Sequence, residues 1–194
     1  MVTEPLICIS SGLICPGSMC LQVVRSSEEK GDWCMSVEIR PAQKEDAATI
    51  LHFINELATY VREPDVVLNT VEAIETHLFG DNVHAYALIC EKEGEAIGFA
   101  VYFFNYSTWV GRYGLYLEDL YVSPEYRGTG AGKAIIRYLA QIAVSQQCGR
   151  FEWVVLDWNQ KAKDFYRRIG ALPQDDLTIC RLSGEALLQF AESN

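Results

Sequence analysis

At 194 residues the chain is long enough for one domain with a full core and short for two. Its 16 Lys and Arg residues against 26 Asp and Glu give a net charge of −10, which argues against nucleic acid as a partner because that ligand needs a basic surface. The sequence contains no run of 18 apolar residues, so it predicts no membrane span.

Residues 1–34 are predicted to be an extension, flexible or not native to the domain, and residues 35–194 a single domain that begins at Met35. Pro5, Gly12, Pro16 and Gly17 interrupt the short apolar pieces of the extension, and no basic residue precedes them, which argues against a secretory signal. The 7 cysteines are odd in number and lack C-x-x-C spacing. They therefore indicate neither a zinc site nor a disulfide framework, and they favour a reducing, cytoplasmic location.

The remaining sequence alternates strand and helix patterns. Strands are expected over 37–40, 85–91, 96–104, 113–122, 151–156 and 177–182, and helices over 45–60, 70–80, 134–147, 161–168 and 184–192. This order predicts an α/β domain with a mixed, mostly antiparallel sheet and helices on both faces.

Three alternating glycines, Gly128, Gly130 and Gly132, stand directly before the helix expected at 134–147. Glycine permits close approach of the backbone to a ligand, and the free N–H groups of a helix start attract phosphate. Arg127 and Lys133 flank the run with two cations, which suits a pyrophosphate. An ordinary glycine-rich turn is the alternative.

A dinucleotide-binding unit requires G-x-G-x-x-G immediately after the first strand, whereas this chain has G-x-G-x-G after a later strand. Asp157 stands where such a unit has its ribose-binding acid, so this interpretation stays open. A P-loop is excluded because its motif is absent.

Arg127-x-x-Gly130-x-Gly132 follows the apolar run at 117–122, and two further blocks cover 155–159 and 162–171. Together they resemble the acetyl-CoA motifs of the GNAT N-acetyltransferase superfamily, from about Val37 to the C-terminus. The segments 106–112, 116–119 and 156–160 resemble the diamine acetyltransferase subgroup, which includes the thialysine N-epsilon- and spermidine/spermine acetyltransferases.

The resemblance implies the GNAT acyl-CoA N-acyltransferase fold, acetyl-CoA as co-substrate and no metal. It implies that pantetheine pairs with one strand as an added strand, where that strand splays from the segment 151–156. The cofactor-binding residues that it implies are Leu120, Tyr121, Val122, Arg127, Gly128, Thr129, Gly130, Ala131, Gly132, Lys133, Asn159, Ala162 and Tyr166.

The same resemblance assigns two catalytic residues. Tyr166 is expected to donate a proton to the departing CoA thiolate, with a core aromatic as the alternative. A lysine-like amine, with a pKa of about 10.4, arrives protonated at neutral pH. Glu118 is the expected base, acting through a water, although binding of the ammonium group alone or a structural salt bridge stays open. Asp119 is expected on the opposite face of the strand.

On the acceptor side the resemblance implies Tyr60, Trp109, Glu118, Glu152, Trp153 and Val154. Val61 and Ser107 replace carboxylates of the polyamine enzymes, which favours a shorter or lysine-like amine. The family further implies a homodimer.

The function predicted is acetyl-CoA-dependent N-acetylation of a small, cationic primary amine by direct transfer in a ternary complex. The alternatives are a non-catalytic CoA-binding or sensing module and a protein or peptide N-acetyltransferase. His52, His77 and His84 are dispersed and predict no metal site.

Overall fold

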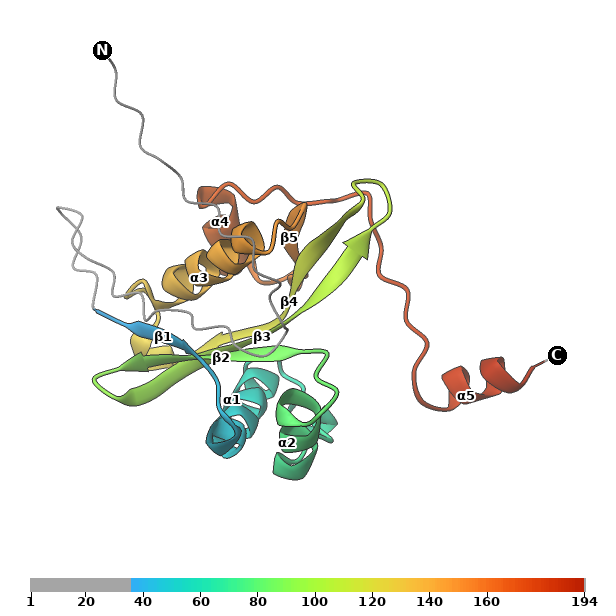
Figure 1. Ribbon diagram of the computed structural model, residues 1–194, viewed down its shortest axis with the longest axis horizontal. Coiled ribbons are helices and arrows are strands. Elements are labelled where there is room, and N and C mark those ends of the chain that lie inside the picture. The colour runs from blue at the N-terminus through green and yellow to red at the C-terminus, as the bar shows by residue number, and fades with distance from the viewer. Residues whose placement is uncertain (1–35, 194) are drawn as a thin grey trace, which may run out of the picture. The chain divides into compact units, whose positions relative to one another are not determined.

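The computed structural model describes residues 36–193, which form two compact units (Figure 1). The first unit ends at Trp153 and the second begins at Val154. The predicted extension at 1–34 lies outside the described residues. The first unit contains the strands β1 (Glu38–Pro41), β2 (Tyr86–Lys92), β3 (Glu95–Ser107), β4 (Arg112–Val122) and β5 (Arg150–Trp153), the helices α1 (Ala47–Tyr60), α2 (Val71–Phe79) and α3 (Ala131–Ser145), and the short helices η1 (Lys44–Asp46), η2 (Pro64–Val66) and η3 (Pro124–Tyr126).

The five strands of the first unit lie in chain order across one sheet. Each pair of neighbours is antiparallel except β4 and β5, which are parallel. A parallel pair needs a crossover connection, and α3 provides it. The predicted mixed, mostly antiparallel sheet is therefore confirmed.

Helices cover both faces of this sheet, with α1 and α2 on one face and α3 on the other (Figure 1). Under α1 the ring of Phe53 packs against Phe99 of β3 and Tyr121 of β4, at centroid distances of 5.8 and 6.0 Å. On α3 the buried Ile135, Leu139 and Ile142 recur at helical spacing, which gives this helix one apolar face toward the sheet.

The C-terminus of α1 is closed by backbone hydrogen bonds. The N–H of Glu63 donates to Ala58 O at 2.9 Å and that of Arg62 to Thr59 O at 3.1 Å, which is the Schellman pattern. Arg62 adopts the left-handed conformation that this pattern needs, with φ of 69°. These bonds fix the last turn of α1, which ends with Tyr60.

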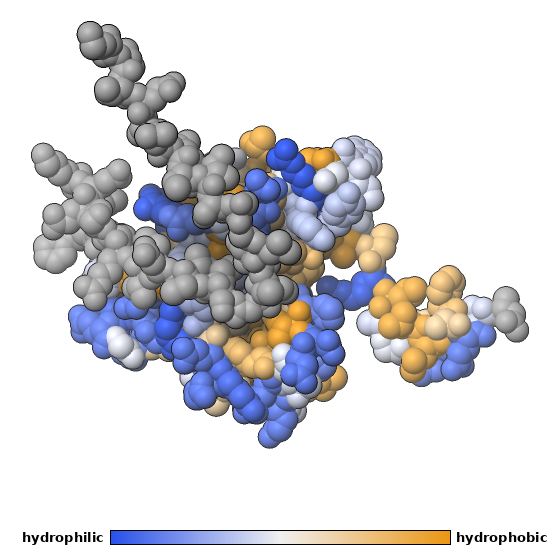
Figure 2. All heavy atoms as spheres, viewed as in Figure 1, coloured by the Kyte–Doolittle hydropathy of each residue, from blue (hydrophilic) through white to orange (hydrophobic). Residues whose placement is uncertain are grey.

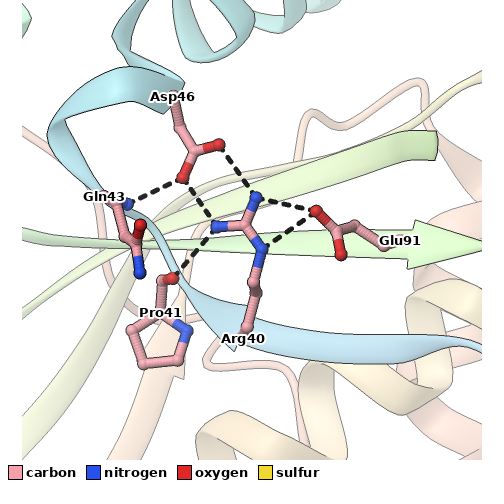
Figure 3. Close-up of polar contacts among 5 residues, drawn as sticks. All are labelled: Arg40, Pro41, Gln43, Asp46 and Glu91. Atoms are coloured by element: carbon pink, nitrogen blue, oxygen red, sulfur yellow. Dashed lines mark hydrogen bonds and ion pairs between the residues drawn. The ribbon is translucent and has the colours of Figure 1, made fainter. Parts of the chain in front are cut away.

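The guanidinium of Arg40 joins β1, η1 and β2 (Figure 3). It binds both carboxylate oxygens of Asp46, at 2.6 and 2.9 Å, and donates twice to Glu91 Oε1, at 2.9 and 2.7 Å. The hydrogen bond from Arg40 lowers the pKa of Asp46, and these contacts raise the pKa of Arg40. The cluster ties the edge strand β1 to the start of the α1 layer.

A one-residue bulge interrupts β4 at Glu118. Leu117 pairs with Tyr102 and Asp119 pairs with Val101, so Glu118 has no partner in the ladder with β3. Adjacent residues of β3 face opposite sides of the sheet, and the bulge therefore moves the odd-numbered side chains of β4 from one face to the other. This shift brings Tyr121 into the core beneath α1.

The second unit contains α4 (Gln160–Arg168) and α5 (Gly184–Glu192). Two predictions near it are wrong. The strand expected at 151–156 ends at Trp153, and the segment 177–182 forms no strand. Leu177, Ile179 and Leu182 alternate as a strand would, but their side chains are exposed, and alternation alone does not make a strand without a neighbouring one. The predicted helix at 184–192 is confirmed. Its apolar residues Leu187, Leu188 and Phe190 are exposed, and Figure 2 shows hydrophobic atoms, in orange, on the surface of α5.

Candidate active site

The glycine-rich loop connects η3 to α3. Gly128 and Gly130 adopt φ values of 80° and 99°, which other residue types rarely adopt. Gly130 is the N-cap residue of α3, so the first turn of this 15-residue helix has no side chain at its cap position to bind its N–H groups. Lys133 in this turn is exposed. The loop thus presents backbone N–H groups and a cation at the positive end of a helix dipole, which is the arrangement that binds an anion.

Beside this loop β4 has an open side. Its pairing with β5 ends at Leu117 and Trp153, whereas its pairing with β3 continues to Val122. In the first unit, residues 118–122 therefore keep a strand neighbour on one side alone. The predicted cofactor residues Leu120, Tyr121 and Val122 lie in this segment. An extended ligand arm can pair with such an edge through backbone hydrogen bonds.

Two consecutive carboxylates lie at the bulge, at the point where β5 ends. Glu118 is exposed, and Asp119 is half-buried. Burial, with the negative charge of Glu118 as a second cause, raises the pKa of Asp119 to about 6. The bulge interrupts the regular alternation on which the prediction of opposite faces rested. Glu118 is thus an accessible carboxylate, and Asp119 is a carboxyl group that retains its proton more readily.

The acceptor-side residues of the first unit lie on α1, β4, β5 and the hairpin between β3 and β4. Glu152 of β5 accepts a hydrogen bond from Asn105 Nδ2 at 2.8 Å and forms an ion pair with Arg150 at 3.2 Å. Trp153 follows Glu152 and contacts Phe151, with ring centroids 4.9 Å apart. Trp109, in the hairpin between β3 and β4, is 98% exposed. In the first unit Trp109 is thus an accessible side chain rather than part of the core.

Ser107, at the end of β3, is 6% exposed, and its Oγ accepts a hydrogen bond from the N–H of Val110 at 3.3 Å. The Ser107 hydroxyl therefore stabilises the hairpin turn between β3 and β4.

The second unit holds Val154, Asn159, Ala162 and Tyr166. The Asn159 side chain accepts a hydrogen bond from the N–H of Ala162 at 3.2 Å, so Asn159 is the N-cap of α4. Tyr166 is half-buried on α4, and its ring lies 5.3 Å from that of Phe165. Val154 is exposed and lies outside β5. The roles predicted for these residues stay predictions.

Sequence reasoning missed how the Arg127 side chain lies. Its Nε donates to the carbonyl of Val122 at 2.8 Å, and its guanidinium carbon lies 4.5 Å from the ring centroid of Tyr60 and 5.2 Å from that of Tyr121. The structure thus brings together one residue predicted for the acceptor, Tyr60, and three predicted for the cofactor, Tyr121, Val122 and Arg127. Glu56, which accepts a hydrogen bond from Tyr121, was also missed, although its spacing of four from Tyr60 places both on one face of α1.

Among residues 36–193, no helix has the length and apolar character that a membrane span needs. Within the same residues no group of His, Cys, Asp and Glu side chains is placed to hold a metal ion. Cys90, Cys148 and Cys180, which belong to this described part, are free thiols.

Comparison with known proteins gives concordant matches. Residues 52–171 match the Acetyltransferase (GNAT) family. The chain is 42% identical over 170 residues to the thialysine N-epsilon-acetyltransferase of Sus scrofa, a match that covers 80% of this chain and 98% of the relative. It is 35% identical to the human spermidine/spermine N(1)-acetyltransferase-like protein 1, over 79% of this chain and 24% of that protein. Among solved structures, an integron cassette protein of V. cholerae superposes with a TM-score of 0.70 at 26% identity, over 82% of this chain and 99% of its own.

Proposed function

Since this chain belongs to the acetyltransferase (GNAT) family, we propose that it transfers an acetyl group from acetyl-CoA to a small primary amine. The observation that carries the proposal is the juxtaposition in the first unit of an anion-binding loop, an unpaired segment of β4 and an exposed carboxylate at a bulge in that segment. A cofactor with a pyrophosphate, an extended amide-containing arm and a reactive end matches these three features in order.

The residues of the loop fit a pyrophosphate. Gly128 and Gly130 give the backbone its left-handed turns, and a Cβ atom placed on Gly132 would meet no atom within 4 Å, so space is open above the first turn of α3. We assign the N–H groups of residues 128–133 and the Lys133 ammonium to the phosphates, and the open side of residues 120–122 to the pantetheine arm. Bound acetyl-CoA supplies an activated thioester.

Glu118 accepts the proton of the substrate ammonium in this proposal. An amine with a pKa of about 10.4 is almost wholly protonated at neutral pH, and only the free amine is a nucleophile. The exposed Glu118 carboxylate removes the proton through a water, or binds the ammonium group if the base is another species. Tyr166 donates a proton to the thiolate, since a phenol is a weak acid.

The proposed substrate is a lysine-like compound or a short diamine. The relatives named above act on thialysine or are similar to spermidine/spermine acetyltransferases. Val61 and the buried Ser107 provide no carboxylate for a long polycation. Glu152, held by Asn105 and Arg150, is the acid assigned to the second charge of a shorter amine.

The test is thiol release from acetyl-CoA in the presence of lysine analogues, diamines, polyamines and peptides. Release of CoA with small amines and none with peptides supports the proposal. Binding of acetyl-CoA with no release for any amine favours the non-catalytic module, and turnover confined to peptides favours a peptide acetyltransferase.

Two variants test the catalytic roles. Glu118→Gln is expected to reduce the rate most near neutral pH and to recover partly at high pH, where free amine is present without a base; an unchanged pH profile removes the base assignment. Glu45→Gln, an exposed carboxylate of η1, is the control.

Tyr166→Phe is expected to lower kcat by roughly 10²- to 10³-fold with little change in acetyl-CoA affinity. Tyr113→Phe, which removes the hydroxyl of an exposed tyrosine, is its control.

A homodimer and a cytoplasmic location complete the proposal. The exposed Trp109 and Val110 of the hairpin are apolar groups suited to a contact with a second copy, and the free thiols of the described residues suit a reducing compartment. Sedimentation velocity at several protein concentrations tests the dimer, and Trp109→Ser should shift the distribution toward monomer.

A further inference from the structure

The Arg127 side chain is turned toward α1 and β4. Its Nε donates to the carbonyl of Val122, the last residue of β4, and its guanidinium lies within cation–π distance of two aromatic rings, those of Tyr60 and Tyr121. Arg127 directly precedes the glycine loop and follows η3. One side chain therefore connects the start of the loop to the end of β4 and to the last residue of α1.

The partners of Arg127 are themselves held in place. Tyr121 is 4% exposed, and its hydroxyl donates to Glu56 Oε2 at 2.9 Å. Glu56 lies four residues before Tyr60, so both side chains project from the same face of α1. The hydrogen bonds that close α1 after Tyr60 limit the freedom of this last turn. We name this cluster the loop clamp; it consists of Arg127, Tyr60, Tyr121 and Glu56.

The geometry points to Tyr60 as a positioning residue for acetyl-CoA: its ring, through the Arg127 guanidinium, holds the loop at 128–133 in the conformation that receives the pyrophosphate. This inference rests on the proposed function, which assigns that loop to acetyl-CoA. It changes the role of Tyr60, which sequence reasoning places with the amine alone. In this inference Arg127 positions the loop through its contacts with α1 and β4, and the backbone N–H groups and Lys133 contact the phosphates.

The energetic consequence is a contribution to affinity by preorganisation. A loop already held in its binding conformation loses less conformational freedom when the ligand arrives. One cation–π contact at a partly exposed site corresponds to about 3- to 10-fold in a binding constant. Tyr60 as a whole residue is 37% exposed, so this range applies.

The test is a double-mutant cycle on acetyl-CoA affinity, measured by calorimetry with the full chain and without amine. Tyr60→Leu and Arg127→Gln are each expected to weaken binding about 3- to 10-fold, and the double variant is expected to be no weaker than the weaker single one. Tyr60→Phe, which keeps the ring, should bind within 2-fold of the unmodified protein. Tyr86→Leu is the matched control, because Tyr86 is 42% exposed and its ring contacts Tyr102 of β3, away from the loop.

Kinetics and salt dependence separate positioning from a general structural role and from a direct phosphate contact. Tyr60→Leu should raise KM for acetyl-CoA about 3- to 10-fold, and Tyr60→Phe, which keeps the ring, should restore it. The Arg127→Gln effect should persist between 0.05 M and about 0.5 M salt, whereas an exposed ion pair with phosphate weakens strongly over that range.

Three results would each overturn the inference. The first is that the two single substitutions reduce acetyl-CoA affinity independently, so that their effects multiply in the double variant. The others are an unchanged acetyl-CoA affinity in Tyr60→Leu and an effect of Arg127→Gln on affinity that disappears at high salt. If the unmodified protein binds acetyl-CoA while the cycle is multiplicative, only the clamp fails. If the unmodified protein does not bind acetyl-CoA, the proposed function fails together with the clamp.

Discussion

Gly114→Ala is predicted to destabilise the first unit although Gly114 has an ordinary strand conformation. A Cβ atom on this residue would lie 2.4 Å from Asn105 Oδ1 and 2.9 Å from Arg150 Cγ. No carbon atom tolerates such approaches, so both side chains must move. They are the two groups that hold Glu152, and the substitution therefore releases the acid assigned to the amine.

The magnitude follows from the contacts that are lost. The hydrogen bond from Asn105 to the Glu152 carboxylate is partly buried and is worth about 1–1.5 kcal/mol. The ion pair between Arg150 and Glu152 is about 40% exposed at both ends, at 41% and 39%, and adds at most about 0.5 kcal/mol. The displaced side chains add roughly 1 kcal/mol of crowding, while alanine lowers the entropy of the unfolded chain and returns about 0.4–1 kcal/mol. The net expectation is a loss of about 1–2 kcal/mol.

Urea denaturation monitored by tryptophan fluorescence measures this loss, and a decrease in Tm of about 2–8 °C should accompany it. Gly132→Ala is the matched control, because a Cβ atom there meets nothing within 4 Å and the residue lies inside α3; it should stabilise the fold by up to about 1 kcal/mol. Asn105→Ala removes the atom that obstructs the new methyl group, so Gly114→Ala should cost clearly less in that background. Equal costs in both backgrounds, or a neutral Gly114→Ala, would refute the steric argument.

Three further predictions concern single groups. Burial raises the pKa of Asp119 to about 6 in the folded protein, whereas an unfolded aspartate ionises near pH 3.9. Stability therefore falls between about pH 4 and pH 6, and the loss is complete above pH 6. Asp119→Asn should raise the free energy of unfolding by about 2 kcal/mol at pH 7.5 and by little at pH 3.5. The ionised carboxylate of Asp46 stabilises the fold, because its hydrogen bond with Arg40 lowers its pKa. This stabilisation is complete above about pH 4 and is lost as the pH falls through the lowered pKa. Asp46→Asn should therefore cost about 1–2 kcal/mol at pH 7, and it should make the stability of the protein depend less on pH in the acid range. Asn159→Ala should reduce the helicity of α4 and cost about 1 kcal/mol in the second unit, whereas Asn159→Asp should retain the cap; equal circular dichroism for all three proteins would contradict the cap.

Most elements were predictable because their signals are local. The apolar spacing of α1, the threonine that caps α2 and the turn at 92–95 each depend on neighbouring residues in the chain. The segment 177–182 shows the limit of this reasoning. Its alternation is as regular as that of a strand, but a strand requires a neighbour, and no local pattern specifies one.

The candidate site was predictable in its residues more than in its geometry. The glycine spacing predicts the left-handed turns at Gly128 and Gly130 and the helix start that follows them, because these are backbone properties that glycine favours directly. The direction of the Arg127 side chain depends on Tyr60, which lies 67 positions earlier, and on the carbonyl of Val122. From the sequence alone, a cation next to a glycine-rich loop is expected to bind phosphate, because the aromatic rings that contact Arg127 in the fold are distant in the sequence or on another element.

The bulge at Glu118 connects the carboxylate proposed as the base to the loop clamp. Without it, Asp119 and Tyr121 would stay on the face of Leu117, toward α3, and Tyr121 would reach neither Phe53 nor Glu56 on α1. The extra residue also removes Glu118 from the ladder with β3, at the position where pairing with β5 has just ended. One inserted residue thus accounts for an exposed acid at the open side of β4 and for a buried tyrosine that anchors Arg127. A regular strand of the same composition provides neither, because strict alternation would keep Tyr121 on the face of Leu117 and Glu118 in the ladder with β3.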